Sequence, residues 1–399
     1  MDEKSNMNTR IQELLKMLDE VDDFNREIIE KGSVKVGKGK EIKKEEKKVE
    51  VKRIMSPREI VKELDKTVIG HSEAKKQLAT IFFKYLMERE NYDEKDYTKS
   101  NVFISGASAN GKTHLITELC RILNMDYIVV NCGQLSQSGY KGGDIEDELK
   151  MLYNKCDGDI DRLNKSVVIL DEIGKCKPSK GGDGVDVGGE GVLKGLLKIL
   201  ENTEIEVERS SGYFKTKDSF STKNIMFIGL DTLMMGEENI ETIVRKRLDK
   251  SEIKTMGFMA DKVNRKAEIH TRNEIRKAIT LDDLISLGFS AEFVSRFNVL
   301  INLELLTRED FVKIAKLNTN GFNSYERIMS EYGKKLKVKE EVYEIFADLM
   351  SKTETGSRAV KGYVDKIMSE IIYDMVDNKK KKTYVVDTEM VNKTLRLEE

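Results

Sequence analysis

The sequence predicts an α/β fold in which helices cover a parallel β-sheet, followed by a smaller, mainly helical domain. The first observation is that short apolar segments suited to strands alternate with helical stretches, which is typical of a helix-covered parallel sheet. These segments span residues 101–105, 127–131, 166–170 and 224–229. The second observation is a change near residue 305 to mainly helical patterns, with short strands expected near 336–338 and 383–386. We therefore expect a large domain over 56–304 and a small domain over 305–399.

Composition limits the partners that the chain can have. The 69 basic and 71 acidic residues give a net charge of −2, so nucleic acid is not indicated as a partner. No apolar run approaches the roughly 20 residues of a membrane span, and the polar N-terminus lacks the apolar core of a signal peptide. The cysteines Cys120, Cys132, Cys156 and Cys176 have no metal-binding spacing. We expect buried, reduced thiols in a cytoplasmic protein that does not engage a membrane.

Three elements are expected before the first strand. Apolar side chains within residues 8–30 form one helical stripe, so an amphipathic helix is expected within 1–30. Residues 31–55 are rich in Gly, Lys and Glu, as in a charged linker. Ser56 then offers a helix cap, with proline next and glutamate three residues later, which predicts a helix to about Leu64. A break at Gly70 separates it from a further helix to Met87.

The stretch FISGASANGKTHLI, residues 103–116, fits a phosphate-binding loop between a strand and a helix. Its glycines let backbone N–H groups converge on phosphate oxygens, and the helix over 113–123 directs its positive end at them. Lys112 would reach the β- and γ-phosphates, and Thr113 would bind Mg²⁺. An ordinary strand-to-helix turn is the alternative. The expected ATP-binding residues are Gly106, Ala107, Ser108, Ala109, Asn110, Gly111, Lys112, Thr113 and His114.

A second acidic motif completes the predicted chemistry. The apolar strand SVVIL ends in Asp171 and Glu172. Asp171 would hold Mg²⁺, and Glu172 would orient and polarise the attacking water. Together with the phosphate loop, this pair predicts nucleotide hydrolysis. The three histidines show no metal spacing and no nucleophile motif is present, so protease, hydrolase-triad and zinc chemistry have no support.

Longer segments resemble the ClpX family of AAA+ unfoldases, over about residues 55–395. The segments are SPREIVKELDKTVIGHSEAKKQL, GASANGKT, GYKGGDIEDELKMLYNKCDGDIDRLNKSVVILDEIGK, DVGGEGVLKGLLKILENTEI, GFSAEFVSRFNVL and TGSRAVKGYVDKIM. The resemblance implies a P-loop AAA+ large domain, a small sensor-2 domain, and ATP and Mg²⁺ as cofactors. It also implies a homo-hexameric ring that threads protein substrates through its pore, in partnership with a ClpP-type peptidase.

The resemblance further implies roles for individual residues. Val68 and Ile69 match the segment that flanks the adenine. Arg296 matches the arginine finger, which reaches the nucleotide of a neighbouring subunit, and Arg358 matches the sensor-2 arginine. A surface ion pair is the alternative for each arginine. The gripping pore loop corresponds to Gly139, Tyr140, Lys141 and Gly142, and the peptidase-docking tripeptide to Met256, Gly257 and Phe258. A plain turn and an ordinary loop are the respective alternatives.

The sequence departs from the family pattern in ways that affect function. No cysteine precedes Cys120, so we expect no N-terminal zinc-binding domain, and the usual adaptors are in doubt. Residues 208–224 contain no Arg-Lys-His, which leaves recognition of the usual degradation tags open. Asp231 and Thr232 both fall at the sensor-1 strand, and neither is assigned that role. Two other functions therefore stay open: a peptidase-independent remodeller of protein or nucleoprotein complexes, and a nucleotide-gated scaffold.

Overall fold

The computed structural model describes the chain from residue 54 onward, with gaps. The described ranges are 54–135, 144–176, 189–211, 214–235, 238–251, 265–317, 321–353, 356, 358–378 and 380–397. Contacts divide the chain into two units, Met1–Val51 and Lys52–Glu399, and every described residue belongs to the second. The helix expected within 1–30 and nearly all of the linker over 31–55 lie outside the described residues.

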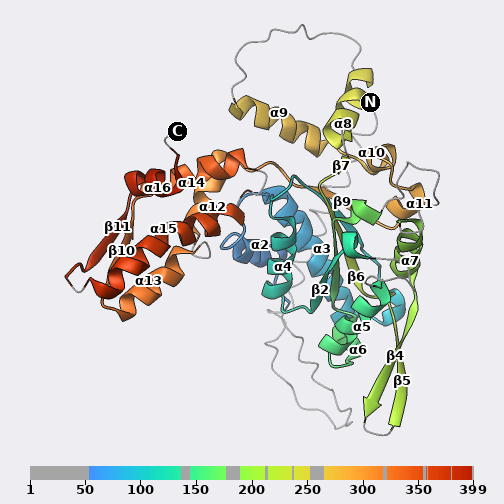
Figure 1. Cartoon of the computed structure of the whole chain (residues 1–399). Helices are drawn as coiled ribbons and strands as arrows, with labels where there is room; N and C mark the ends of the chain where they lie inside the picture. The colour runs from blue at the N-terminus through green and yellow to red at the C-terminus, as the bar shows by residue number, and fades with distance from the viewer. Residues whose placement is uncertain are drawn as a thin grey trace, which may run out of the picture. The chain divides into compact units, whose positions relative to one another are not determined.

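Within the described residues, the central sheet consists of five parallel strands in the order β2–β3–β6–β1–β9 (Figure 1). The strands are β1 (Val102–Ser105), β2 (Tyr127–Asn131), β3 (Val167–Asp171), β6 (Met226–Asp231) and β9 (Val299–Asn302). Every residue of β1 and β6 is buried, which explains their continuous apolar sequences. The predicted parallel sheet is confirmed, and all four predicted strands are present. β9, at one edge of the sheet, was not predicted.

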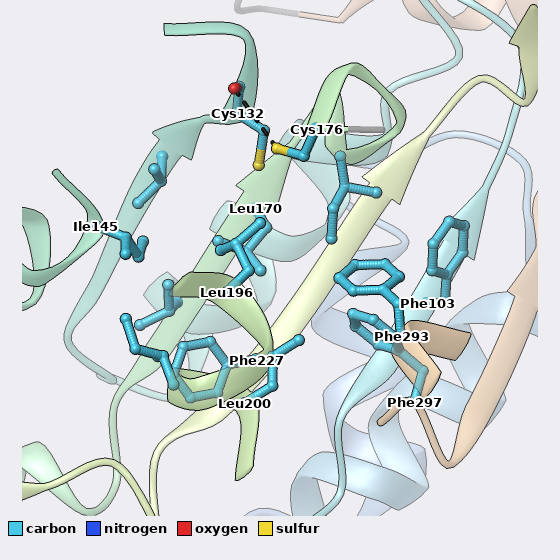
Figure 2. Packing of buried hydrophobic residues seen from close by; sticks show 14 of the residues in the cluster. Phe103, Cys132, Ile145, Leu170, Cys176, Leu196, Leu200, Phe227, Phe293 and Phe297 are labelled. Carbon is cyan, nitrogen blue, oxygen red and sulfur yellow. Dashed lines mark hydrogen bonds between the residues drawn. The ribbon is translucent and has the colours of Figure 1, made fainter. Parts of the chain in front are cut away.

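The alternation of side chains along the strands divides the interior into two hydrophobic clusters. Val102 and Ile104 of β1 face one cluster, whereas Phe103 faces the other. The first cluster is covered by α2 (Pro57–Leu64), α3 (Ser72–Asn91) and α4 (Lys112–Ile122). The second is covered by α5 (Ile145–Lys155), α6 (Ile160–Leu163), α7 (Gly189–Glu201), α8 (Ile240–Ser251), α9 (Arg265–Lys277), α10 (Leu281–Ser286) and α11 (Ala291–Val294). Figure 2 shows this second cluster, in which leucines of α7 and phenylalanines near α11 pack on the strands.

Local chemistry fixes where α2 begins. The Ser56 hydroxyl accepts a hydrogen bond from the Glu59 N–H (3.4 Å), and the Glu59 carboxylate accepts one from the Ser56 N–H (2.9 Å). This reciprocal pair satisfies two N–H groups that the helix itself leaves unpaired. The predicted capping box is therefore confirmed, with Pro57 as the first residue of α2.

Residues 208–224, which differ from the family pattern, lie largely in a hairpin that the sequence analysis missed. β4 (Glu204–Ser211) and β5 (Phe214–Ser221) pair in antiparallel fashion (Figure 1). The buried side chains Ile205, Val207 and Phe220 anchor the hairpin in the second cluster. The remaining short elements of this part are β7 (Met234–Met235), β8 (Glu238–Asn239), η1 (Glu94–Asp96), η2 (Cys132–Gln134) and η3 (Ile173–Cys176).

The C-terminal part is mainly helical, as expected, and has a hydrophobic core of its own, built around Phe346, Val364 and Ile367. Its elements are α12 (Arg308–Lys316), α13 (Phe322–Glu331), β10 (Lys335–Val338), α14 (Glu340–Lys352), α15 (Arg358–Asp377), β11 (Thr383–Val386) and α16 (Thr388–Leu395). β10 and β11 pair in parallel. In the part of the chain that the structure describes, no helix is long and apolar enough to cross a membrane.

Candidate functional site

The predicted phosphate loop forms the turn between β1 and α4. Gly111, the N-cap residue of α4, has a φ of 76°, a left-handed conformation that favours glycine. The N–H groups in the first turn of α4 have no partner within the helix, so an anion can bind to them at the loop. Gly106 is held against the neighbouring strand, since its N–H donates to the Asp231 carbonyl at 3.1 Å.

A cavity of about 460 Å³ opens at this loop and at the carboxyl ends of β3 and β6. Open α/β sheets bind their ligands at this edge. The lining residues are Ser108, Ala109, Asn110, Gly111, Lys112, Thr113, His114, Asp171, Glu172, Gly174, Lys175, Asp231, Thr232, Met234 and Arg358. The structure thus brings together most of the predicted loop, both predicted acids and the predicted sensor-2 arginine. Val68, Ile69, Gly106, Ala107 and Arg296 are not among the lining residues.

Lys112 is buried at the base of the loop. Its ammonium group donates to the carbonyls of Gly106 (3.0 Å) and Ala107 (2.9 Å), so these two residues contact the site through their backbone. Burial lowers the pKa of Lys112 to about 8, while the nearby carboxylates of Asp171 and Asp231 act in the opposite direction. A phosphate beside this ammonium group would favour its protonated form.

Oxygen ligands suited to Mg²⁺ converge where α4 meets β3. The Thr113 hydroxyl donates to Asp171 Oδ2 at 2.8 Å. Hydroxyl and carboxylate oxygens, completed by phosphate oxygens and water, are the usual ligands of Mg²⁺ in nucleotide sites. The residues present therefore fit this ion. Among the described residues, no cluster of three or more His, Cys, Asp or Glu side chains forms a separate metal site.

Glu172 lies beside Asp171 at the exposed rim of the cavity. Its backbone is left-handed, with a φ of 56°, which turns the chain sharply after β3. The side chain is about half exposed and pairs with Lys175 at 2.7 Å. The carboxylate therefore faces solvent near the cavity and is held by a weak, exposed ion pair.

Gly174 and Asp231 form a contact that the sequence analysis missed. The Asp231 carboxylate accepts hydrogen bonds from the N–H groups of Gly174 (2.5 Å) and Leu233 (2.7 Å). A Cβ atom on Gly174 would lie only 2.5 Å from Asp231 Oδ2. The carboxylate of Asp231 thus ties β6 to η3, and both Asp231 and Thr232 line the cavity. The glycine in the segment DEIGK, Gly174, is the sequence feature that could have indicated this close approach of the Asp231 carboxylate to the backbone.

Among the residues before α3, His71 contacts the phosphate loop, and the adenine-flanking role expected of Val68 and Ile69 stays a prediction. Val68 is buried, and its carbonyl accepts a hydrogen bond from Lys75 (2.5 Å), whereas Ile69 is half-buried. His71 Nε2 lies 3.0 Å from the Asn110 carbonyl of the loop. Burial lowers the pKa of His71, so a neutral ring is favoured.

The C-terminal part also contacts the loop. Arg358, the first residue of α15, lines the cavity, and a Cβ atom on Gly356 would lie 2.9 Å from the Cβ of Ala109. Arg296 instead follows α11 and forms an ion pair with Glu201. The pore-loop residues 139–142 and the docking residues 256–258 lie outside the described residues, so their roles stay predictions.

Comparison with known proteins gives the same picture. Residues 60–300 match the family model described as AAA domain (Cdc48 subfamily). The chain is also 29% identical, over 376 residues, to the ATP-dependent clpX-like chaperone, mitochondrial, of Saccharomyces cerevisiae (strain ATCC 204508 / S288c), with 84% of this chain and 71% of that protein covered. The family match spans more than half of the chain and includes the loop and both acids. The chain therefore belongs to the AAA family and is a ClpX-like AAA+ ATPase.

Proposed function

We propose that this ATP-dependent unfoldase works as a homo-hexameric ring that pulls polypeptides through a central pore. One observation carries the proposal: a single cavity is lined by the phosphate loop, the acidic pair and Arg358 from the C-terminal part. A ligand that contacts both parts of the chain can convert hydrolysis into movement between them. The name of the yeast relative, an ATP-dependent clpX-like chaperone, supports the same activity.

In this proposal, ATP binds with its phosphates at the N-terminus of α4. Backbone N–H groups of residues 108–111 and the Lys112 ammonium group bind the phosphate oxygens. Thr113 and Asp171 hold Mg²⁺, which would neutralise phosphate charge when bound. Gly106, Ala107 and His114 shape the loop, and the segment with Val68 and Ile69 flanks the adenine. Arg358 adds a positive charge from the C-terminal part.

Glu172 acts as the base in this scheme. Its carboxylate would accept a hydrogen bond from the attacking water and so orient it toward the terminal phosphate. To do so, the carboxylate leaves Lys175, and this costs little because both side chains are about half exposed or more. Arg296 of a neighbouring subunit would stabilise the charge that develops on the transferred phosphate.

Tyr140 would grip the substrate. An aromatic side chain between the glycines Gly139 and Gly142 can push on a polypeptide of any sequence, with Lys141 beside it. The test compares how well wild type and Tyr140→Ala unfold a fluorescent protein. This reporter is fused to a polypeptide that the Glu172→Gln chain retains in the presence of ATP. We expect the variant to hydrolyse ATP at a similar rate but to unfold the reporter poorly. Equal unfolding by both proteins would contradict threading by Tyr140, and no unfolding by either protein would favour the nucleotide-gated scaffold.

We also propose a ClpP-type peptidase as a partner, docked through Met256, Gly257 and Phe258. An apolar and an aromatic side chain around a glycine suit a small hydrophobic pocket. Deleting these three residues should abolish degradation by the added peptidase while ATP hydrolysis and unfolding continue. Unchanged degradation would contradict docking by these residues, and a wild-type chain that never supports degradation would favour the peptidase-independent remodeller.

A further inference from the structure

The main chain of Arg296 is fixed in the core of the second hydrophobic cluster. Phe293 and Phe297 flank it, each 1% exposed, and the Phe297 ring packs edge-on against Phe103 of β1 with centroids 5.4 Å apart (Figure 2). The Arg296 N–H donates to the Phe293 carbonyl (3.1 Å), and its carbonyl accepts from the Asn101 amide (3.0 Å). Only the side chain of Arg296 can therefore change its position without disturbing the core.

The guanidinium group is only partly satisfied. Nη2 forms an ion pair with Glu201, and the next carboxylate, that of Glu292, lies 4.0 Å away. Nε is buried and has no hydrogen-bond partner within the described part of the chain. Because a guanidinium group carries five N–H donors, Arg296 retains donors for a further anion.

The main chain of Glu201 is also anchored in the second cluster. Glu201 is the last residue of α7, directly after Ile199 and Leu200, which are buried in the same cluster. Its carbonyl accepts a hydrogen bond from the Lys99 ammonium group (3.3 Å), which also donates to the Thr222 carbonyl (3.2 Å). The carboxylate itself is half exposed. Two anchored main chains thus bring an acid and the candidate arginine finger together at the surface.

We propose that Glu201 is a positioning residue that holds Arg296 in a resting orientation and competes with nucleotide phosphate for its guanidinium group. The proposal rests on the assignment of Arg296 as the arginine finger. An ion pair between partly exposed side chains is weak, whereas a phosphate carries more charge and accepts two parallel hydrogen bonds from arginine. The phosphate of a neighbouring subunit can therefore displace Glu201, and the arginine returns to the acid after hydrolysis.

A double-mutant cycle on the assembled full chain tests this role. The variants are Glu201→Gln, Arg296→Ala and their combination, with Glu292→Gln as the matched control for loss of a nearby carboxylate. Single-turnover ATP hydrolysis is measured because it also resolves slow variants, and thermal unfolding confirms that each variant folds. We expect Glu201→Gln to accelerate hydrolysis about two- to fivefold, the range that the free energy of an exposed ion pair allows. Glu292→Gln should leave the rate unchanged.

The decisive comparison is the effect of Glu201→Gln when Arg296 is missing. If Glu201 acts through Arg296, the substitution has no effect in the Arg296→Ala background. An equal effect in both backgrounds, or an unchanged or slower rate with Arg296 present, would overturn the inference. If Arg296→Ala hydrolyses ATP as fast as wild type, the arginine-finger assignment itself fails, and the role of Glu201 fails with it.

Discussion

Replacing Gly174 with alanine should damage both the stability of the large domain and its ATP hydrolysis. Gly174 lies in η3, two residues after Glu172, and donates its N–H to the Asp231 carboxylate at 2.5 Å. An added Cβ atom would lie 2.5 Å from Asp231 Oδ2 and 3.1 Å from its Cγ. Contacts this short cannot persist, so either the carboxylate or η3 must move.

Both movements are costly. If the carboxylate moves, it loses hydrogen bonds from Gly174 and Leu233, each worth roughly 1.5–3 kcal/mol for a charged acceptor. If η3 moves, the strain of an overpacked site costs about 1–3 kcal/mol. The cheaper response, movement of η3, therefore destabilises the domain by about 1–3 kcal/mol. For a domain of this size, that lowers the unfolding temperature by about 2–6 °C.

Thermal unfolding and steady-state ATP hydrolysis measure the two effects. Gly362→Ala is the matched control, since Gly362 lies in α15 with nothing within 4 Å of an added Cβ atom. It should keep or slightly raise the unfolding temperature, because alanine is the better helix former. A Gly174→Ala protein as stable and as active as the control would refute the steric argument.

Three further predictions concern the site. Glu172→Gln should bind ATP but hydrolyse it about a hundredfold more slowly, because the amide cannot act as a base; near-wild-type turnover would contradict the assignment. Burial lowers the pKa of Lys112 to about 8, and phosphate favours its charged form. Above pH 8, Lys112 should therefore take up a proton when ATP binds, and the affinity for ATP should fall as the pH rises. Calorimetry in buffers of different ionisation enthalpy detects this uptake, which Lys112→Arg should lack. Because of the same lowered pKa, Lys112 binds more protons in the unfolded chain than in the folded chain between about pH 8 and 10.5. The contribution of Lys112 to the free energy of unfolding should therefore rise with pH in that range. Lys112→Met should flatten the pH dependence of the unfolding temperature in that range.

Much of the fold could be predicted because local signals agreed with the tertiary structure. The capping box at Ser56 and the buried apolar strands β3 and β6 each have a sequence signature that depends on near neighbours. β9 lacked such a signature, since three of its four residues are only half-buried at the sheet edge. The β4–β5 hairpin was missed because its outer strand residues are mostly charged or small, with few buried anchors.

The loop and the acids of the site were equally accessible from sequence, because their spacing along the chain reflects phosphate and metal chemistry. Contacts between distant segments of the chain could not be predicted from the sequence. His71 meets Asn110, Gly174 meets Asp231, and Arg296 meets Glu201, only after the chain has folded. The two members of each pair lie far apart in the sequence, and no spacing rule indicates that they will meet.

The most direct test of polypeptide threading is an ATP-dependent trap. A tagged Glu172→Gln chain would be expressed in its native host and recovered with ATP, beside a Glu172→Gln chain that also carries Tyr140→Ala. The proposed mechanism predicts that the first protein retains polypeptides inside its ring and that the second retains far fewer. Rings that hold no polypeptide, or equal retention by both proteins, would contradict it.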